Sequence, residues 1–354
     1  VPESVSLIRA GATITSIQRT DHLVTVNVNG GYPGNNLKAG QLIKISGVTS
    51  DRTLNGVYRI YDVTLNYSGA ADRFRYYCYG DNNASAIIDS GMTAGGHYSS
   101  LVEWEADFGG TSGVLTWDNV RATAECYNDW PGGYLLSSDP ECLDVYGWST
   151  DDTHYVSVLA PVTERHTGVL LNGSSYTGFT LRTNAAWIDY LLRVRQPYTR
   201  VVGLAFDGQN AVYNTGSIGL RVQQVPHVSV DSCLFADIAG TGGGSGMGLG
   251  AGYADYLRVT NCIAYGCQYA GFTIGATPSA YIANSTAYDS VRGFVLDENS
   301  RLINCVAVGN ATIGFDIDVS VANRTSAWYC FSDSADDDLE DANNAGATTC
   351  DNDL

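Results

Sequence analysis

The chain has 354 residues and a formal net charge of −18, from 37 acidic and 19 basic residues. Its 40 glycines and 23 tyrosines, beside 8 prolines and 2 methionines, indicate a β-rich, turn-rich protein. The only lysines are Lys38 and Lys44, and no block of basic residues exists, so a cationic nucleic-acid-binding face is excluded. No apolar run approaches the roughly 18–20 residues that span a bilayer, so membrane insertion is not expected.

Residues 1–95 have the pattern of a small all-β module. Apolar residues alternate in short segments separated by turns of Gly, Asn and Asp, which predicts a compact antiparallel barrel or sandwich. The predicted strands are 23–28, 41–47, 57–63 and 73–79. With Leu54-Asn55-Gly56-Val57-Tyr58 between two of these strands, the segment resembles small β-modules of bacteriophage virion proteins. That resemblance implies attachment of a distal domain to a capsid or tail.

A short helix is predicted at 99–107, after a possible hinge at Gly95-Gly96. Ser100 and Glu103 have the spacing of a capping box, in which each side chain bonds a free amide at the start of the helix. Leu101 and Trp104 would form its apolar face. A single amphipathic helix before a long β region predicts a cap over the open end of a sheet stack.

Two markers repeat together through residues 96–330. Asparagines recur at Asn261, Asn284, Asn304 and Asn323, at intervals of 23, 20 and 19 residues. A Gly-Phe pair recurs at 271–272, 293–294 and 314–315. A period near 20 residues with asparagine at a bend predicts a β-solenoid, whose coils of short parallel strands bury their core by stacking. We expect Asn261, Asn284 and Asn304 to form a ladder at one bend and Phe272, Phe294 and Phe315 to stack inside.

Seven of the nine cysteines fall into two groups. Cys233, Cys262 and Cys305 share one repeat position with Ser285, and an earlier copy of the repeat lies at 230–236, so these thiols are expected to fill one inward row. The remaining candidates for disulfides are Cys126 with Cys142 and Cys330 with Cys350. A reduced state of these four is an equal alternative.

The Asn-Cys-x-Ala and Gly-Phe markers of each coil resemble the right-handed parallel β-helix of pectate lyases and phage tailspikes. A wider resemblance to phage and environmental β-helix proteins covers 97–330. It rests on 100–106, 124–129, 147–155, 165–168 and 198–204. The resemblance implies an all-β, virion-associated protein.

An enzymatic role requires residues that the sequence offers only weakly. Glycoside hydrolysis needs two carboxylates about 5–9.5 Å apart. The candidates are Asp207, Asp231 and Asp255, with His227 nearby; turn aspartates that bond their own backbone are the favoured explanation. The motifs of polygalacturonase-type β-helix hydrolases are absent. We therefore predict no catalytic residue, while a polysaccharide hydrolase or lyase remains the alternative.

Cofactor and metal sites are not expected. The five histidines are dispersed, and no zinc or calcium spacing occurs. The glycine-rich segment 240–250 lacks the lysine and the strand-to-helix context of a phosphate loop, so it is interpreted as a flexible excursion from one coil. The end, 331–354, is interpreted as an acidic tail or cap. Trp130, Trp148, Trp187 and Trp328 could stack on sugars, but packing is the favoured role.

Together these features predict a non-enzymatic virion structural protein. It would be a capsid decoration, head-fibre or tail-appendage subunit on the particle surface, with host polysaccharide as a candidate ligand. The alternatives are a polysaccharide-degrading tailspike and a bacterial surface adhesin. Residues 1–95 would contact other virion proteins, and a neutral aromatic lateral face would form a homo-oligomer, most simply a trimer.

Overall fold

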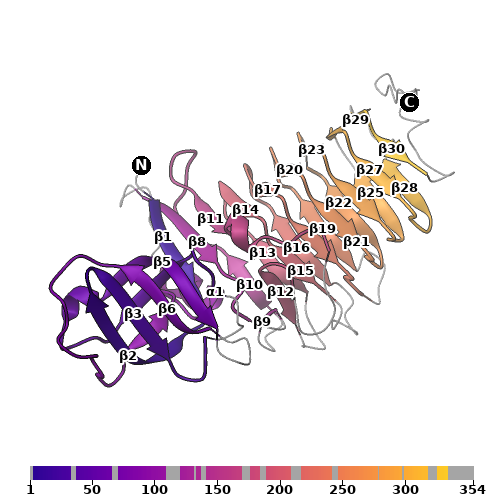
Figure 1. Cartoon of the computed structure of the whole chain (residues 1–354). Coiled ribbons are helices and arrows are strands. Elements are labelled where there is room, and N and C mark those ends of the chain that lie inside the picture. Colours follow the sequence, from indigo (N-terminus) through magenta and orange to yellow (C-terminus); the bar gives the residue numbers. More distant parts are fainter. Residues whose placement is uncertain are drawn as a thin grey trace.

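The computed structural model contains a closed β-barrel beside one end of a long parallel β-helix, and the chain ends at the other end of that helix (Figure 1). This confirms the all-β fold with its solenoid and small N-terminal module. The structure describes residues 3–32, 37–65, 71–108, 120–130, 133–136, 141–169, 176–183, 189–208, 217–240, 246–277, 279–296, 299–317 and 325–333.

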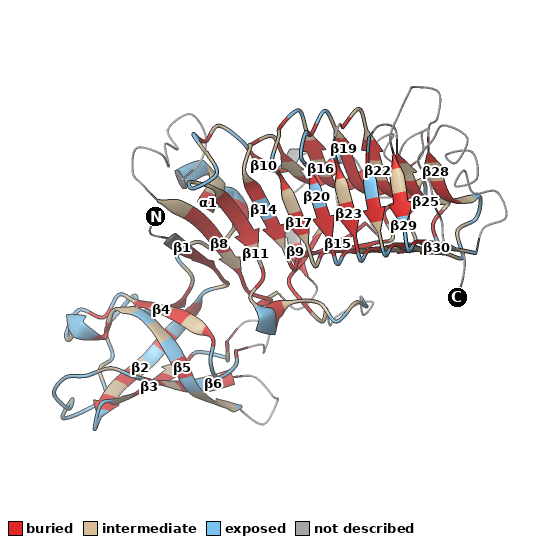
Figure 2. Ribbon diagram, turned by 90° about the horizontal axis from the view of Figure 1, so that it is seen from above, coloured by how far each residue is buried: buried red, intermediate tan, exposed pale blue. Residues whose placement is uncertain are grey.

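The β-helix has three parallel sheets, each of which receives one strand from most coils. Sheet 1 consists of β1 (Glu3–Ile8), β8 (Arg121–Cys126), β11 (Val156–Leu159), β14 (Thr199–Val202), β17 (Ser229–Asp231), β20 (Arg258–Thr260), β23 (Tyr281–Ala283), β26 (Arg301–Ile303) and β29 (Ser326–Trp328). Figure 2 shows this sheet from outside, with buried and more exposed positions alternating along its strands.

The other two sheets complete each coil. Sheet 2 consists of β9 (Tyr134–Leu136), β12 (Thr180–Thr183), β15 (Ala205–Asp207), β18 (Leu234–Ala236), β21 (Ile263–Tyr265), β24 (Thr286–Tyr288), β27 (Val306–Val308) and β30 (Phe331–Ser332). Sheet 3 consists of β10 (Glu141–Val145), β13 (Tyr190–Val194), β16 (Ile218–Gln223), β19 (Met247–Gly252), β22 (Ala270–Gly275), β25 (Arg292–Leu296) and β28 (Ile313–Ile317).

The Gly-Phe marker forms the predicted internal stack. Phe272 and Phe294 lie 4.9 Å apart between ring centroids, Phe294 and Phe315 lie 5.1 Å apart, and all three rings are buried. The preceding glycine is required because a Cβ on Gly293 would lie 2.3 Å from the backbone oxygen of Gly314 in the next coil. The close spacing of successive coils therefore explains both residues of the marker. It leaves no room for a side chain at the glycine, and it brings the phenylalanine rings into stacking contact.

The asparagine marker forms the predicted ladder at the bend between sheets 1 and 2. Asn304 Nδ2 donates to Asn284 Oδ1 over 2.9 Å, and Asn284 Nδ2 donates to Asn261 Oδ1 over 3.3 Å. All three residues have a positive φ of 51–55°, which asparagine tolerates better than most residues. The asparagine marker does not continue to Asn323 in the next coil. The register places Tyr329 at that position, and Asn323 lies outside the described residues.

The predicted thiol row is confirmed and is longer than expected. Cys233, Cys262, Ser285 and Cys305 occupy equivalent buried positions in successive coils, and Cys330 follows them. Cys330 and Cys126 are free thiols, so neither forms the disulfide considered for it. Burial raises the pKa of Cys262 well above the ordinary value for a thiol. The side chain of Cys142 and all of Cys350 lie outside the described residues.

Helix α1 (Leu101–Phe108) caps the first coils, as expected. Leu101 and Trp104 are fully buried and pack into the core of the β-helix. The Ser100 hydroxyl accepts from the Glu103 amide over 2.9 Å, whereas the Glu103 carboxylate bonds Ser99 and not Ser100. Within the described residues, no helix is long and apolar enough to span a membrane.

The barrel is closed by six antiparallel strands around its own core. It contains the predicted strands and two that were not predicted, the first and the last. The strands are β2 (Ala12–Thr20), β3 (Leu23–Val28), β4 (Leu42–Ser46), β5 (Gly56–Leu65), β6 (Ala71–Tyr77) and β7 (Thr93–Gly95).

The predicted module boundary at residue 1 needs correction because β1 belongs to the β-helix. It pairs in parallel with β8, from Glu3 opposite Arg121 to Ile8 opposite Cys126. The barrel is therefore an insertion between the first strand and the cap of the β-helix. Its two ends meet, since a Cβ on Gly95 would lie 3.0 Å from Gly11 Cα. Gly96 is tightly packed against Leu7 and is not an open hinge.

A buried ion pair joins the barrel to the β-helix. The Arg9 guanidinium donates two 2.8 Å bonds to the Asp129 carboxylate, and both side chains are 0% exposed. The same guanidinium bonds the Leu42 carbonyl and the Gln41 amide oxygen of the barrel. Gln41 in turn donates to Glu164 at the end of the short helix η4 (Val162–Glu164) over 2.6 Å. These bonds fix the two parts against each other.

The glycine-rich segment differs from its prediction. Residues 246–252 are buried or half-buried, and Met247–Gly252 forms strand β19. The glycines allow close packing there: a Cβ on Gly248 would lie 2.6 Å from the Gly271 carbonyl oxygen. The segment 240–250 is therefore not one projecting loop, and 241–245 lie outside the described residues.

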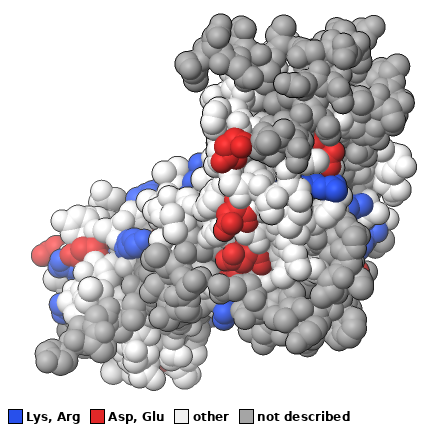
Figure 3. Space-filling view, turned by 90° about the vertical axis from the view of Figure 1, so that its right-hand side faces the viewer, with Lys and Arg blue, Asp and Glu red and all other residues white. Residues whose placement is uncertain are grey.

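On the face of the molecule seen in Figure 3, uncharged side chains cover most of the described surface, with small groups of acidic and basic residues among them. Part of the acidic C-terminal stretch, 334–354, lies outside these residues, while Phe331–Ser332 forms the last strand of sheet 2.

Candidate binding groove on sheet 1

The predicted catalytic candidates lie at separate places on the β-helix. Asp207 is buried on sheet 2 and accepts a 2.5 Å bond from Tyr176, whereas Asp231 lies at the bend between sheets 1 and 2. His227 and Asp255 are exposed and lie at the opposite end of the sheet 1 strands, just before β17 and β20. The fold does not combine these four residues into one site.

Asp231 ends the asparagine ladder. Its carboxylate accepts from Thr260, Asn261 and Ser232 over 2.6, 2.8 and 2.9 Å. Burial alone would raise the pKa of Asp231, but these three bonds outweigh it and hold the pKa below the ordinary range for aspartate. A carboxylate with a lowered pKa stays ionised, which suits a ladder terminus and not a general acid.

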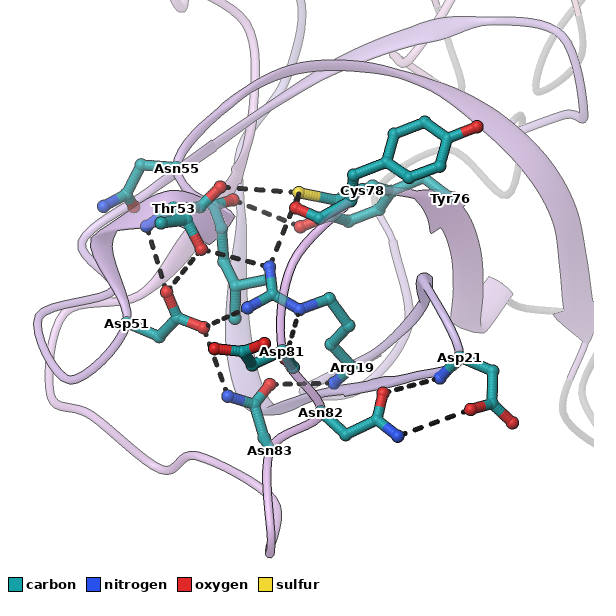
Figure 4. Close-up of polar contacts among 12 residues, drawn as sticks. Arg19, Asp21, Asp51, Thr53, Asn55, Tyr76, Cys78, Asp81, Asn82 and Asn83 are labelled. Carbon is teal, nitrogen blue, oxygen red and sulfur yellow. Dashed lines mark hydrogen bonds and ion pairs between the residues drawn. The ribbon is translucent and has the colours of Figure 1, made fainter.

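A second polar cluster, at one end of the barrel, has a structural role. Arg19 is buried and bonds the Asp51 carboxylate, the Thr53 hydroxyl and the Asp81 carbonyl over 2.8, 3.0 and 2.7 Å (Figure 4). The Thr53 hydroxyl and other hydrogen-bond donors lower the pKa of Asp51. The guanidinium is fully occupied in joining loops to β2. Within the described part of the chain, no group of three metal-ligating side chains occurs.

A groove on the outer face of sheet 1 has the chemistry of a ligand site. We call it the arginine–tyrosine groove, and it extends from the coil of β11 to the coil of β26. Its defining residues are Tyr155, Tyr198, Arg200, His227, Tyr256, Arg258, Tyr281 and Arg301. One hollow of about 230 Å³ includes Tyr198, His227 and Tyr256, and a second of about 460 Å³ follows along the sheet at Tyr281 and Arg301.

The rings of the groove stack because the coil repeat places them one above another. Tyr198 and His227 lie 4.7 Å apart with 14° between their planes, and His227 and Tyr256 lie 4.8 Å apart with 2° between theirs. These distances match the roughly 4.8 Å spacing of neighbouring strands. All three residues have positive φ at the bend before sheet 1, which holds the rings at equivalent positions.

The arginines occupy the adjacent outward row of sheet 1. The register aligns Arg200, Ser229, Arg258, Tyr281 and Arg301 in five successive coils, so an arginine recurs in every second coil. The Arg200 guanidinium carbon lies 3.6 Å from the Tyr155 ring centroid, and that of Arg258 lies 4.9 Å from the Tyr281 centroid. Such ring contacts orient a guanidinium and leave its N–H edge available.

The three arginines are exposed, and none has a carboxylate partner among the described residues. Elsewhere arginines are commonly paired; Arg193 and Arg195, for example, share Asp144. Among the described residues that line the two hollows, Asp152 alone is acidic. In a chain of net charge −18, three arginines without a carboxylate partner among the described residues therefore lie along one groove.

Sequence reasoning missed this groove, although a signal exists. Tyr198, His227 and Tyr256 are separated by 227 − 198 = 29 and 256 − 227 = 29 residues, and Arg200 and Arg258 by twice that interval. The tryptophans considered as alternative sugar platforms do not line this groove among the described residues. Trp148 is buried, Trp328 is 42% exposed on the last strand of sheet 1, and Trp187 lies outside the described residues.

Comparison with known proteins agrees with this fold. Residues 167–326 match the family model described as a right-handed beta helix region. No curated protein matches the chain. The β-helix is thus a right-handed one, as the sequence markers indicated.

Two solved structures are similar to the chain, both from Pseudomonas phages. The tailspike protein gp49 of phage LKA1 has 12% identity and a TM-score of 0.22, with 92% of this chain and 47% of that chain covered. The tailspike gp61 of phage phi297 has 11% identity and a TM-score of 0.18, with 93% and 64% covered. The chain thus spans about half to two thirds of their lengths, and a likeness this low establishes no activity.

Proposed function

We propose that this protein is a bacteriophage virion appendage whose β-helix binds a surface polysaccharide along the arginine–tyrosine groove without cleaving it. The observation that carries the proposal is the groove itself, which continues over successive coils and offers rings and cations in register. The stacked rings cover one another's faces, so a polymer lying along them meets ring edges and tyrosine hydroxyls, which bond sugar hydroxyls, and these also accept from arginine. An extended groove suits a polymer better than a small molecule.

Binding without cleavage is favoured by the placement of the carboxylates. A glycosidase requires an acid and a second carboxylate across one glycosidic bond. Asp152 is the one acid lining the groove among the described residues, and Asp231 is held in its ionised form by the asparagine ladder. Asp207 lies on a different sheet.

The test is incubation of the purified protein with surface polysaccharides of candidate host bacteria, with binding and new reducing ends measured in the same samples. We expect retention of at least one polysaccharide and a constant number of reducing ends. Tyr256→Ala should weaken retention, whereas Tyr79→Ala, which alters an exposed tyrosine of the barrel, should not. Steady release of ends that Asp231→Asn or Asp152→Asn abolishes would establish a depolymerase instead.

We further propose that the barrel attaches the β-helix to the particle. The barrel is an insertion held rigidly by Arg9 and Asp129, so it can position the long axis of the β-helix. Because Gly11 and Gly95 are adjacent, residues 12–94 can be removed by joining these two glycines. The shortened chain should keep its β-sheet circular dichroism and fail to join particles assembled in its presence. Normal incorporation would contradict the attachment role.

The proposed assembly is a homotrimer packed through lateral faces of the β-helix. Only 16% of the residues are charged, which favours an uncharged lateral contact, while the net charge of −18 disfavours close approach elsewhere. Light scattering of the isolated protein should give three times the 37.8 kDa chain mass. A monomer both in solution and on the particle would refute the trimer.

A further inference from the structure

We infer that the ligand of the arginine–tyrosine groove is an acidic polysaccharide, with carboxylate groups that recur along the chain. This inference rests on the proposed function and names the chemical class of its ligand. Arg200, Arg258 and Arg301 lie on one line parallel to the axis of the β-helix, one in every second coil. With about 4.8 Å per coil, their backbones are separated by roughly 10 Å.

The spacing suits a polymer with charges at regular intervals. An extended polysaccharide advances by about one coil per sugar, so arginines in alternate coils match a carboxylate on every second sugar. Between them, Ser229 and Tyr281 provide a hydroxyl and a ring for the intervening uncharged sugar. A neutral glycan would leave three exposed guanidinium groups without an ionic partner.

Contacts with tyrosine rings orient the guanidinium groups of Arg200 and Arg258 so that they can bind carboxylates. Tyr155 lies between two guanidinium groups, with Arg200 at 3.6 Å and Arg121 at 4.8 Å from its centroid. Arg258 is similarly placed over Tyr281. A guanidinium held flat against a ring keeps its planar N–H fork, which bonds both oxygens of a carboxylate. Lysine has no such fork, and both lysines of the chain lie in the barrel.

The net charge makes this arrangement selective. A chain of net charge −18 repels polyanions at long range, so general electrostatic attraction does not account for binding. Only a ligand whose charges align with the arginine row gains enough local contacts. Among the described residues, Asp152 lines the groove and Asp255 precedes Tyr256 in the chain, and both acidic side chains are exposed.

The experiment measures affinity for four purified polymers by titration calorimetry. These are hyaluronan, with a carboxylate on every second sugar; polygalacturonate, with one on every sugar; neutral dextran; and dextran sulfate, with irregular charges. We expect hyaluronan and polygalacturonate to bind and dextran not to bind. Added salt should weaken binding, since exposed ion pairs are screened.

Substitutions locate the binding. Arg200→Gln, Arg258→Gln and Arg301→Gln should each reduce affinity about threefold to tenfold, and the triple variant should abolish binding. Arg258→Lys should restore part of the loss because it keeps the charge without the fork. The matched control is Arg73→Gln, an exposed strand arginine of the barrel, which should leave affinity unchanged. Circular dichroism verifies that each variant is folded.

The outcomes separate the inference from the proposed function. Binding of a neutral polysaccharide that Tyr256→Ala weakens and the arginine variants do not would overturn the acidic ligand and keep the polysaccharide-binding role. Dextran sulfate binding that the triple variant leaves unchanged, with no uronate binding, would also overturn it. Failure to bind any of these polymers or any host polysaccharide would overturn both.

Discussion

The barrel and the β-helix stabilise themselves in different ways. In the β-helix the same contact recurs in successive coils, so Phe294 packs between Phe272 and Phe315, and Asn284 bonds to Asn261 and Asn304. The barrel and its junction depend on single contacts between distant segments, such as Arg9 with Asp129 and Arg19 with Asp51. A repeated contact can be lost once with its neighbours remaining, whereas a single contact has no second copy.

The junction should be the most sensitive point of this comparison. Asp129→Ala leaves the buried Arg9 without its carboxylate, and breaking a buried pair costs about 3–5 kcal/mol. Asp62→Ala, the matched control, removes the half-exposed pair with Arg75 and should cost at most about 1 kcal/mol. Denaturant unfolding of both variants measures this. Equal effects would mean that Arg9 and Asp129 do not hold the parts together.

The internal stack should follow closely. Phe294→Ala removes a fully buried ring between two others and should reduce the free energy of unfolding by about 3–5 kcal/mol. Val295→Ala, at the neighbouring half-buried position of β25, should cost clearly less. Chemical denaturation measures both. A near-neutral Phe294→Ala variant would contradict the buried stack.

The ladder should contribute less because its side chains are exposed. Asn284→Ala removes two amide bonds and places alanine at a φ of 51°, so we expect a loss of about 1–2 kcal/mol. Asn284→Gly removes the same bonds and relieves the backbone strain, and should therefore be the more stable of the two. Thermal unfolding of both variants separates the two contributions. The reverse order of stability would exclude strain at this bend.

The smallest effect concerns pH. The folded-state pKa of Asp231 is depressed, so its ionised form stabilises the protein above the unfolded pKa of about 3.9. This stabilisation should be present at pH 7 and decline from about pH 5 downward, as the pH falls through the folded pKa. The difference in urea midpoint between the parent and Asp231→Asn should shrink over that interval. A difference that stays constant would show that Asp231 does not titrate with unfolding.

The same contrast explains which features the sequence could predict. Phe272, Phe294 and Phe315 recur at a nearly constant interval, so their stacking follows from the period of the coils. The last coil departs from that interval, so the register places Tyr329 after Asn304, whereas the repeat in the sequence had pointed to Asn323. The pairing of Glu3–Ile8 with β8 could not be predicted from the sequence, because the two segments do not share a repeated motif.

The binding groove was missed for a related reason. Its arginines alternate with Ser229 and Tyr281, so no single residue type marks the row in every coil. Asp207 and Asp231 were paired as candidates because 231 − 207 = 24 residues is close to one coil. The register instead places Asp207 opposite Ala236 on sheet 2 and Asp231 opposite Val202 on sheet 1. Register, and not separation along the chain, decides which side chains meet.

The pairing of β1 with β8 has a consequence for the order of folding during synthesis. Glu3 can pair with Arg121 only after the 118 residues up to Arg121 have been synthesised, so the first parallel strand pair forms late. The barrel lies between them and brings its own ends together, because Gly11 and Gly95 are adjacent. Early folding of the barrel would shorten the chain that remains to be closed and reduce the entropic barrier. The folded barrel would then hold β1 close to the segment that becomes β8. The first coil formed in this way offers the strand edges on which the following coils pair.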